Sequence, residues 1–182
     1  QDLPDGRYEW EEWIDQDPGA EDKHPLKVKL AVIIKGDQIT FDFTGTDSSA
    51  LGCMNCSMAT TDGACMVGLK CVFPLPFNYG TLKAINIIAP PGTVVNALKP
   101  SNTQANWNPF TKIVDCVIGA FSQVVPERVI AGCGNLSIFV WGTEDIRRED
   151  KRYCVGYFWQ EVGYGAAANK DGITPRVPLP AG

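Results

Sequence analysis

Residues 26–44, LKVKLAVIIKGDQITFDFT, decide the fold of this chain. Apolar and polar residues alternate here, as in a β-strand with one buried face. The apolar positions of the first half are Leu26, Val28, Leu30, Val32 and Ile34, and those of the second half are Ile39, Phe41 and Phe43. Gly36 and Asp37 supply a turn between the halves. The stretch therefore predicts a β-hairpin with one buried face.

Further elements are expected on both sides of this hairpin. Tyr8 and Trp10 alternate with charged residues, which predicts an edge strand that precedes it, and residues 15–23 are expected to form an acidic, solvated loop. Helices are predicted at 61–73, capped by Thr61 or Asp62, and at 111–125, ended by Pro126. Strands are predicted at 82–88, 93–96, 136–141 and 153–160, with loops at 99–110 and 144–152 and in the Gly-, Ala- and Pro-rich tail.

Strands in neighbouring pairs with two helices between them indicate an α+β fold. We expect a mainly antiparallel sheet built from hairpins, with the two helices packed on it. Residues 1–172 should form a single domain, and residues 173–182 a loop or tail.

Charge and hydropathy exclude several classes of partner. The 182 residues carry 16 Lys and Arg against 21 Asp and Glu, a net charge of −5, and no basic stripe interleaved with aromatic residues. Nucleic-acid binding is therefore not expected. No apolar stretch approaches the roughly 20 residues of a membrane span, and the chain does not open on a signal sequence. The sequence predicts no membrane contact and a cytoplasmic location.

Seven cysteines, an odd number in a core-rich chain, argue against a disulfide framework. Cys65, Cys71, Cys116 and Cys154 lie in apolar segments, where a free thiol packs as a small hydrophobe. Cys53 and Cys56 form a lone CxxC, a weak metal or redox signal without a second pair. Either thiol could still act as a nucleophile, with His24, the only histidine, as its base.

No phosphate-binding loop and no histidine cluster are present, so the carboxylates draw attention. Asp42 precedes Thr44-Gly45-Thr46 at the end of a predicted strand, and Glu161 ends another strand just before Gly163 and Gly165. Carboxylates beside flexible backbone suit acid–base chemistry or ligand contact, although many such residues only shape turns.

Five short motifs occur in an order and spacing that resemble one family. They are DGRYEWEEWID at 5–15, ITFDFTGTDSSALGCMNCS at 39–57, NYGTLKAINIIAPPGTVVNALKPS at 78–101, TKIVDCVIGAF at 111–121 with VPERVIA at 125–131, and YFWQEVGYGAAANKDG at 157–172. Together they resemble the hydantoinase B family, which also includes the B half of 5-oxoprolinase and the large subunits of acetone and acetophenone carboxylases. The resemblance covers the central segment of such a subunit.

The resemblance implies a segment of a B-type catalytic subunit in an ATP-dependent cyclic amide hydrolase. It also implies ATP on a hydantoinase A-like partner subunit, and a divalent metal (Zn or Mn) held outside this segment, in other parts of the same subunit. Two alternatives stay open: the matching subunit of an ATP-dependent ketone carboxylase, and a non-catalytic interaction module.

Catalytic residues are not assigned, and no metal ligand is expected within the chain. The candidate contacts to a small-molecule substrate combine the two carboxylates with residues of the family motifs: Asp42, Thr44, Gly45, Asn55, Glu161, Gly163, Gly165 and Asp171. The aromatic stretch from Tyr8 to Trp13 is a candidate surface for contact with other parts of the enzyme.

Overall fold

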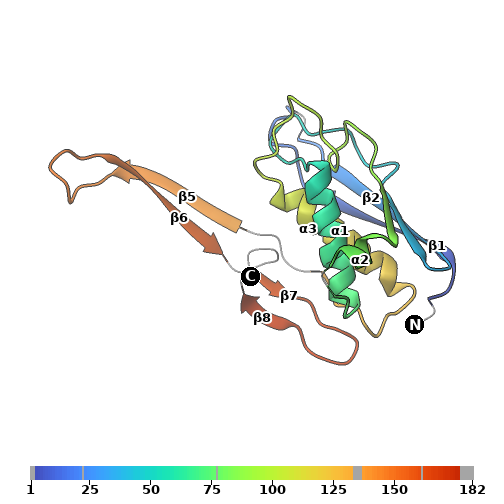
Figure 1. Cartoon of the computed structure of the whole chain (residues 1–182). Coiled ribbons are helices and arrows are strands. Elements are labelled where there is room, and N and C mark those ends of the chain that lie inside the picture. The colour runs from blue at the N-terminus through green and yellow to red at the C-terminus, as the bar shows by residue number, and fades with distance from the viewer. Residues whose placement is uncertain (1–2, 22, 77, 133–136, 161, 177–182) are drawn as a thin grey trace.

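The computed structural model describes residues 3–21, 23–76, 78–132, 137–160 and 162–176 (Figure 1). The strands are β1 (Gly6–Ile14), β2 (Leu26–Lys35), β3 (Gln38–Asp42), β4 (Ile85–Ile88), β5 (Ser137–Glu144), β6 (Tyr153–Gln160), β7 (Val162–Tyr164) and β8 (Ile173–Arg176). The helices are α1 (Met58–Val72), α2 (Tyr79–Leu82) and α3 (Trp107–Ser122). This architecture confirms the α+β class.

The predicted hairpin is the centre of a four-stranded sheet with the order β1-β2-β3-β4. β2 and β3 pair antiparallel up to Lys35 and Gln38, and Gly36 enters the turn with φ +59°, which favours glycine. β1 pairs antiparallel along the whole outer side of β2, so the predicted edge strand is confirmed. β4 is the exception, because it pairs parallel with β3.

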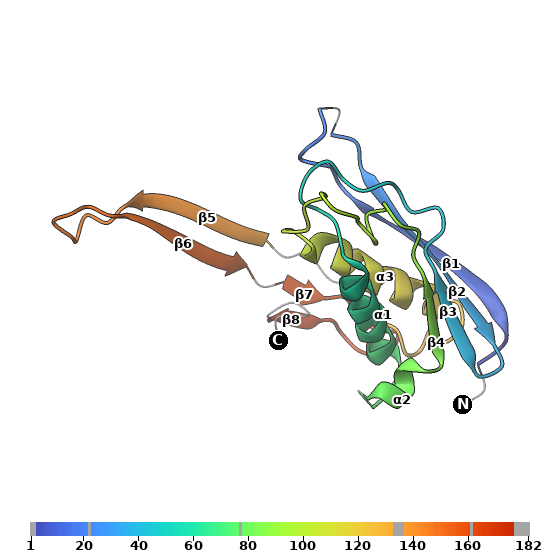
Figure 2. The same cartoon turned by 45° about the horizontal axis from the view of Figure 1, so that its top comes forward.

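The core lies between this sheet and the two long helices. α3 packs on β1 and β2, and α1 packs on α3 (Figure 2). Every apolar residue predicted for the buried face of the hairpin is buried except Ile39, which is partly buried. The helices approach closely at Gly68, where an added Cβ would lie 2.7 Å from Val117 Cβ. A larger residue at position 68 would force the helices apart.

Both long helices begin earlier than predicted, and they end at Val72 and Ser122, before the predicted ends at 73 and 125. α1 begins at Met58 because Ser57 is its N-cap, and the Ser57 side chain accepts a hydrogen bond from the Thr60 amide. Thr61 is not a cap, since its buried hydroxyl donates to the Val95 carbonyl. α3 begins at Trp107, inside the predicted loop, because Pro109 falls in the first turn, where no helical hydrogen bond needs its missing N–H.

Two strand predictions and the loop prediction for the tail also need correction. The predicted strand at 82–88 shortens to β4, and residue 82 belongs to α2. Residues 93–96 form no strand, only isolated bridges from Thr93 to Ser48 and Asn96. The tail is not all loop, because Ile173–Arg176 form β8 against β7. That pairing needs glycine at 172, where an added Cβ would lie 2.4 Å from the Tyr164 carbonyl oxygen.

The outer face of the four-stranded sheet is charged. Arg7 Nε lies 2.8 Å from Glu9 Oε1, and Lys29 Nζ lies 3.3 Å from Glu9 and 3.7 Å from Glu11. The first pair lies within β1 and the other two join β2 to β1, all on the side that faces away from the helices. The sheet thus has one apolar and one polar face, as the alternation in the sequence predicted.

The six cysteines among the described residues are free thiols. Cys65 and Cys116 are fully buried, and burial raises the pKa of both thiols. We therefore expect thiol titration of unfolded, unreduced protein to find all seven cysteines. A deficit of two would contradict this prediction and would point to a Cys53–Cys56 disulfide.

Candidate functional site

The candidate contact residues lie in three different parts of the molecule. Asp42 ends β3 and Thr44 and Gly45 follow it, Asn55 precedes α1, and Gly163, Gly165 and Asp171 belong to the β7–β8 region. The long helices lie between the four-stranded sheet and β7–β8 (Figures 1 and 2). Glu161 lies outside the described residues. The structure therefore does not gather these residues around one cavity.

The turn after β3 is held by its own polar groups. Asp42 Oδ1 accepts a hydrogen bond from the Thr44 amide at 3.0 Å, and Asp42 Oδ2 lies 3.6 Å from Arg7. Burial raises the pKa of Asp42, but the Thr44 hydrogen bonds and the Arg7 charge outweigh it and leave that pKa below its usual value. Gly45 takes φ +95°, and Thr44 is exposed. Asp42 is thus an ionised turn residue with an exposed hydroxyl-bearing neighbour.

Asn55 is fully buried and uses its whole amide inside the chain. Its Oδ1 accepts from the Ala50 amide at 2.7 Å. Its Nδ2 donates to the carbonyls of Ala50, Gly52 and Asn102 at 3.1, 3.2 and 2.9 Å. These bonds join the 50–55 loop to the loop at 102, so the side chain holds two loops together.

Asp17 is a buried carboxylate that the sequence did not single out. It lies in the loop predicted to be solvated, yet it is only 2% exposed. Its oxygens accept hydrogen bonds from the amides of Gly19, Leu51 and Gly52 at 2.7–3.0 Å. Burial raises its pKa, and these hydrogen bonds more than offset that, so the pKa lies below its usual value. The only sequence signal was its place before Pro18-Gly19, where a carboxylate can cap a turn.

Asp17 should make stability depend on acid pH. The pKa of Asp17 is lower in the folded protein than in the unfolded chain, where it is near 3.9. Asp17 therefore contributes its full stabilisation above the unfolded pKa, and this stabilisation is lost as the pH falls through the folded pKa. We expect Asp17→Asn to lower the free energy of unfolding at pH 7 by about 2 kcal/mol, the scale of hydrogen bonds to a charged group. In urea melts this difference should shrink below about pH 4. A difference that stays constant down to pH 2 would contradict the assignment.

Burial argues against Cys56 as the nucleophile of the possible Cys–His site. Cys56 is fully buried and donates to the Asn106 carbonyl, and burial raises its pKa to about 12. That thiol is therefore protonated and inert near neutral pH. Cys53 is partly exposed. The positive charge of His24 lowers the pKa of Asp17, which places this histidine beside a structural carboxylate.

The glycines near the tail allow backbone to meet backbone. An added Cβ at Gly165 would lie 2.4 Å from Ala131 Cβ, and the Ala131 amide donates to the Ala166 carbonyl at 2.9 Å. Gly163 is half-buried, and Asp171 is exposed. The contact of Gly165 with residue 131 fixes the tail against the body, and Asp171 is the candidate contact of this region whose polar group is accessible.

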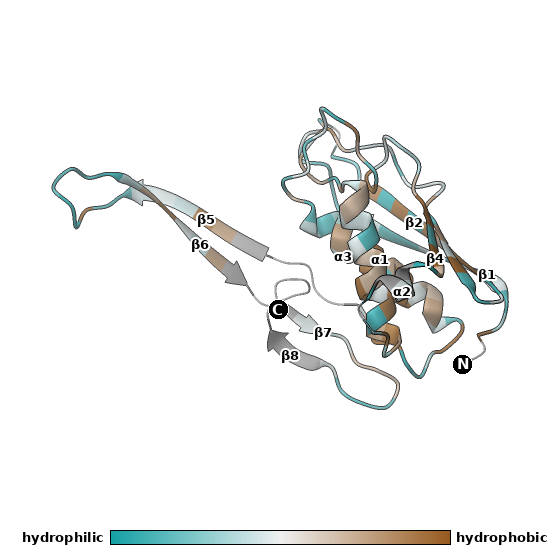
Figure 3. Cartoon of the chain, viewed as in Figure 1, coloured by the Kyte–Doolittle hydropathy of each residue, from teal (hydrophilic) through white to brown (hydrophobic). Residues whose placement is uncertain are grey.

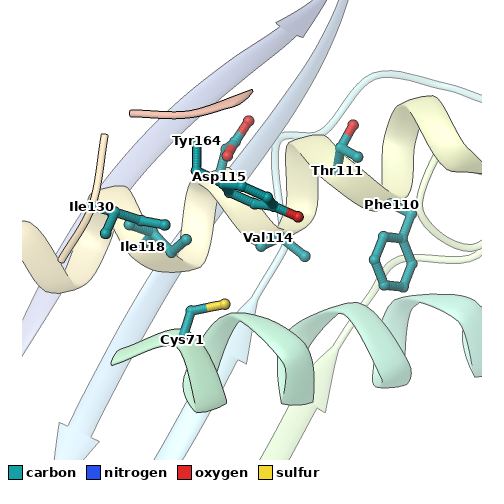
Figure 4. Close-up of a pocket in the computed structure, with 8 residues that line it drawn as sticks. All are labelled: Cys71, Phe110, Thr111, Val114, Asp115, Ile118, Ile130 and Tyr164. Carbon is teal, nitrogen blue, oxygen red and sulfur yellow. The ribbon is translucent and has the colours of Figure 1, made fainter. Parts of the chain in front are cut away.

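Asp115, another carboxylate that the sequence did not single out, lies between two hollows. On one side is a small apolar cavity of about 10 Å³, enough for one water molecule, between α1, α3 and Tyr164 (Figure 4). On the other side is an open cleft of about 400 Å³, which Trp10 and Glu12 of β1 also line. Asp115 is buried, and an added Cβ on Gly132 would lie 3.3 Å from its Oδ1. The sequence signal for Asp115 was the position of an acidic residue inside the apolar stretch 113–121.

The described part of the chain does not fit a metal ion. It contains no group of three or more His, Cys, Asp or Glu side chains that could hold one. The divalent metal implied by the family resemblance has no binding set among these residues. Among the described residues, no helix is long and apolar enough to cross a membrane.

Comparison with known sequences gives a consistent result. The family model described as hydantoinase B/oxoprolinase matches residues 1–179. The putative B subunit of a D-/L-hydantoinase from Pseudomonas sp. (strain NS671) is 30% identical over 94% of this chain and 30% of its own length. The beta subunit of the caprolactamase of Pseudomonas jessenii is 33% identical over 58% of this chain and 19% of its own. The chain thus spans less than a third of the length of these relatives.

Solved structures show the same fold. The ATP-dependent caprolactamase from Pseudomonas jessenii superposes with a TM-score of 0.77 over 96% of this chain and 30% of that chain, at 24% identity. A nucleotide-free acetone carboxylase superposes with a TM-score of 0.79 over 96% of this chain and 25% of that chain, at 18% identity. The fold of these residues is therefore shared across both kinds of enzyme.

Proposed function

The chain belongs to the hydantoinase B/oxoprolinase family, and from this premise we propose that it is a segment of a B-type catalytic subunit in an ATP-dependent cyclic amide hydrolase. The observation that carries the proposal is the similarity to the putative B subunit of a D-/L-hydantoinase along 94% of the chain. The relation to the beta subunit of a caprolactamase supports it, because a lactam is a cyclic amide.

The proposal includes partners that supply what the described residues lack. ATP is held on a hydantoinase A-like partner, and other parts of the B-type subunit hold the divalent metal. The location is cytoplasmic. Within this chain, Asn55 and Gly165 shape the loops, whereas Asp42, Thr44 and Asp171 are the candidate contacts with an accessible polar group.

A ketone carboxylase subunit is the second candidate. The likeness to acetone carboxylase favours it, but at 18% identity this likeness concerns the fold alone. Relatives named for cyclic amides reach 30–33% identity. A non-catalytic interaction module is the third candidate, and the lack of a metal-binding set among the described residues keeps it open.

The discriminating experiment measures ADP release when the intact B-type subunit is mixed with an A-type subunit. Release stimulated by hydantoin, 5-oxoproline or ε-caprolactam supports the hydrolase. Release that requires bicarbonate together with acetone supports the carboxylase, and binding of the A-type subunit without any turnover supports the interaction module.

Asp171→Asn tests the proposed contact in the same assay. It should lower kcat/KM for the active cyclic amide by about tenfold, the scale of one hydrogen bond to a charged group. Asp37→Asn is the matched control, because Asp37 is an exposed carboxylate in the β2–β3 turn. Equal kcat/KM for both variants would remove Asp171 from the site.

A further inference from the structure

The β5–β6 hairpin, here called the arm, extends away from the body of the molecule (Figures 1 and 2). Its strands pair antiparallel without a register shift, from Ser137 opposite Gln160 to Glu144 opposite Tyr153. The extensive contacts of these two strands are with each other. An isolated two-stranded hairpin is marginally stable in water, so the arm needs an additional packing partner.

Both faces of the arm are apolar. Residues directly opposite each other in an antiparallel pair share a face, so Phe139, Trp141 and Phe158 lie on one face. Val140, Tyr153, Val155 and Tyr157 lie on the other. All seven side chains are 52–73% exposed. Figure 3 shows hydrophobic stretches in both strands. The outer face of the main sheet, which faces solvent, is charged instead.

The arm is shaped for packing on its faces and its edges. The Trp141 ring covers Gly156 on one face of the arm, and the Tyr153 ring covers Gly142 on the other face. Neither strand contains Lys, Arg or Pro, the residues that usually protect an exposed strand edge. The turn at 144–152 carries four acidic and four basic residues, several of them paired with each other. It therefore has no charge excess for a lipid surface or a nucleic acid.

The exposed area excludes a simple pairing of two arms. Seven large side chains more than half exposed, with Ile146 in the turn, present roughly 1,000 Å² of mostly apolar surface, since an aromatic side chain alone contributes about 150–250 Å². A stable interface buries about 800 Å² on each partner. Stacking against a second arm covers only one face, which is roughly half of the exposed 1,000 Å². Only a partner that covers both faces reaches a standard interface.

The body of a second copy is also unsuitable. Three open hollows on the described part of the body each have a volume of about 400 Å³. Seven large side chains, each on the order of 100 Å³ or more at the packing density of protein interiors, do not fit. The partner is thus a polypeptide surface with a wider apolar cleft.

We propose that the arm is enclosed on both faces by the polypeptide that B-type subunits carry outside the matched region. This inference rests on the proposed function, because it treats the chain as a segment of such a subunit. The matched region is only 30% of the hydantoinase relative, so seven tenths of that protein is available to form the cleft. A covering layer packs about 10 Å from each face of the arm, so the two walls of the cleft lie about 20 Å apart.

Cysteine labelling of this 182-residue chain and of the intact B-type subunit tests the enclosure. Phe158→Cys and Tyr157→Cys place one thiol on each face of the arm, and Asp37→Cys is an exposed control in the charged β2–β3 turn. Maleimide labelling rates are read for each peptide by mass spectrometry. We expect both arm thiols to react at least 50-fold more slowly in the intact subunit than in the 182-residue chain, with the control unchanged within about threefold.

The other outcomes overturn the inference in distinguishable ways. Protection of one face only means docking on a flat surface, and protection that appears only after addition of the A-type subunit makes that subunit the partner. Concentration-dependent protection in the 182-residue chain itself means a second copy. Unprotected thiols in the intact subunit refute enclosure altogether. ADP release by the same preparations tests the proposed function separately.

Discussion

Phe41→Ala is expected to lower the free energy of unfolding by about 3–5 kcal/mol, the range for a buried aromatic residue truncated to alanine. Phe41 is fully buried in β3, where it lies opposite Val32 on β2 and Ile87 on β4. Truncation removes contacts with both neighbouring strands and with the helices beneath. The surrounding backbone is hydrogen-bonded on both sides, so it cannot collapse into the space.

Thr40→Ala is the matched control for this prediction. Thr40 is the preceding residue of the same strand, on the opposite face and only partly buried. Its truncation should cost less than about 1 kcal/mol, as for most substitutions outside the core. Urea denaturation followed by circular dichroism gives both values. Equal losses would mean that the strand has the opposite phase.

The parts of the fold that follow from residue periodicity could be predicted from the sequence. Strict alternation placed the β2–β3 hairpin and its buried face, because a strand with one apolar face permits a single phase. The runs ended by Pro74 and Pro126 likewise located the two long helices. Neither prediction required knowledge of distant contacts.

Features that depend on distant contacts could not be predicted in the same way. The α1 cap falls on Ser57 and not on Thr61, because the Thr61 hydroxyl is engaged by Val95, 34 residues away. β8 forms because Gly172 lets the tail approach Tyr164 closely. The parallel pairing of β4 with β3 is likewise a tertiary choice that periodicity does not encode.

The candidate site shows the same division. Motif residues were expected to contact a ligand, and this stays a prediction; within the chain, Asn55 binds loop backbone and Gly165 packs on Ala131. The buried carboxylates Asp17 and Asp115 were not selected, because burial depends on segments far along the chain. A family motif identifies the positions that matter without distinguishing a residue that binds from one that shapes a loop.

The surface for contact with other parts of the enzyme was expected at Tyr8–Trp13. Within that stretch, Trp10 packs against Gly119, and Trp13 lies beneath Lys27 at 5.9 Å. Trp10 is nevertheless 37% exposed and Trp13 46% exposed, so this contact surface stays a prediction. The more extensive apolar surface is the arm, and its signal was the lack of polar alternation in 138–141 and 155–159. A strand that is apolar on both sides needs two covering layers.

Asn55→Ala is expected to lower the free energy of unfolding by about 3–5 kcal/mol, because it removes four hydrogen bonds and leaves buried backbone groups unpaired at about 1 kcal/mol or more each. Asn86→Ala is the control, since Asn86 is exposed on β4 and its truncation should cost less than about 0.5 kcal/mol. Urea melts give the stabilities, and KM for the cyclic amide substrate in the intact subunit gives the second readout. If Asn55 holds the loops together, its truncation lowers the free energy of unfolding. If Asn55 contacts the substrate, its truncation raises KM and leaves the urea melt unchanged. Wild-type stability combined with a raised KM would therefore return Asn55 to the substrate site and refute the structural role.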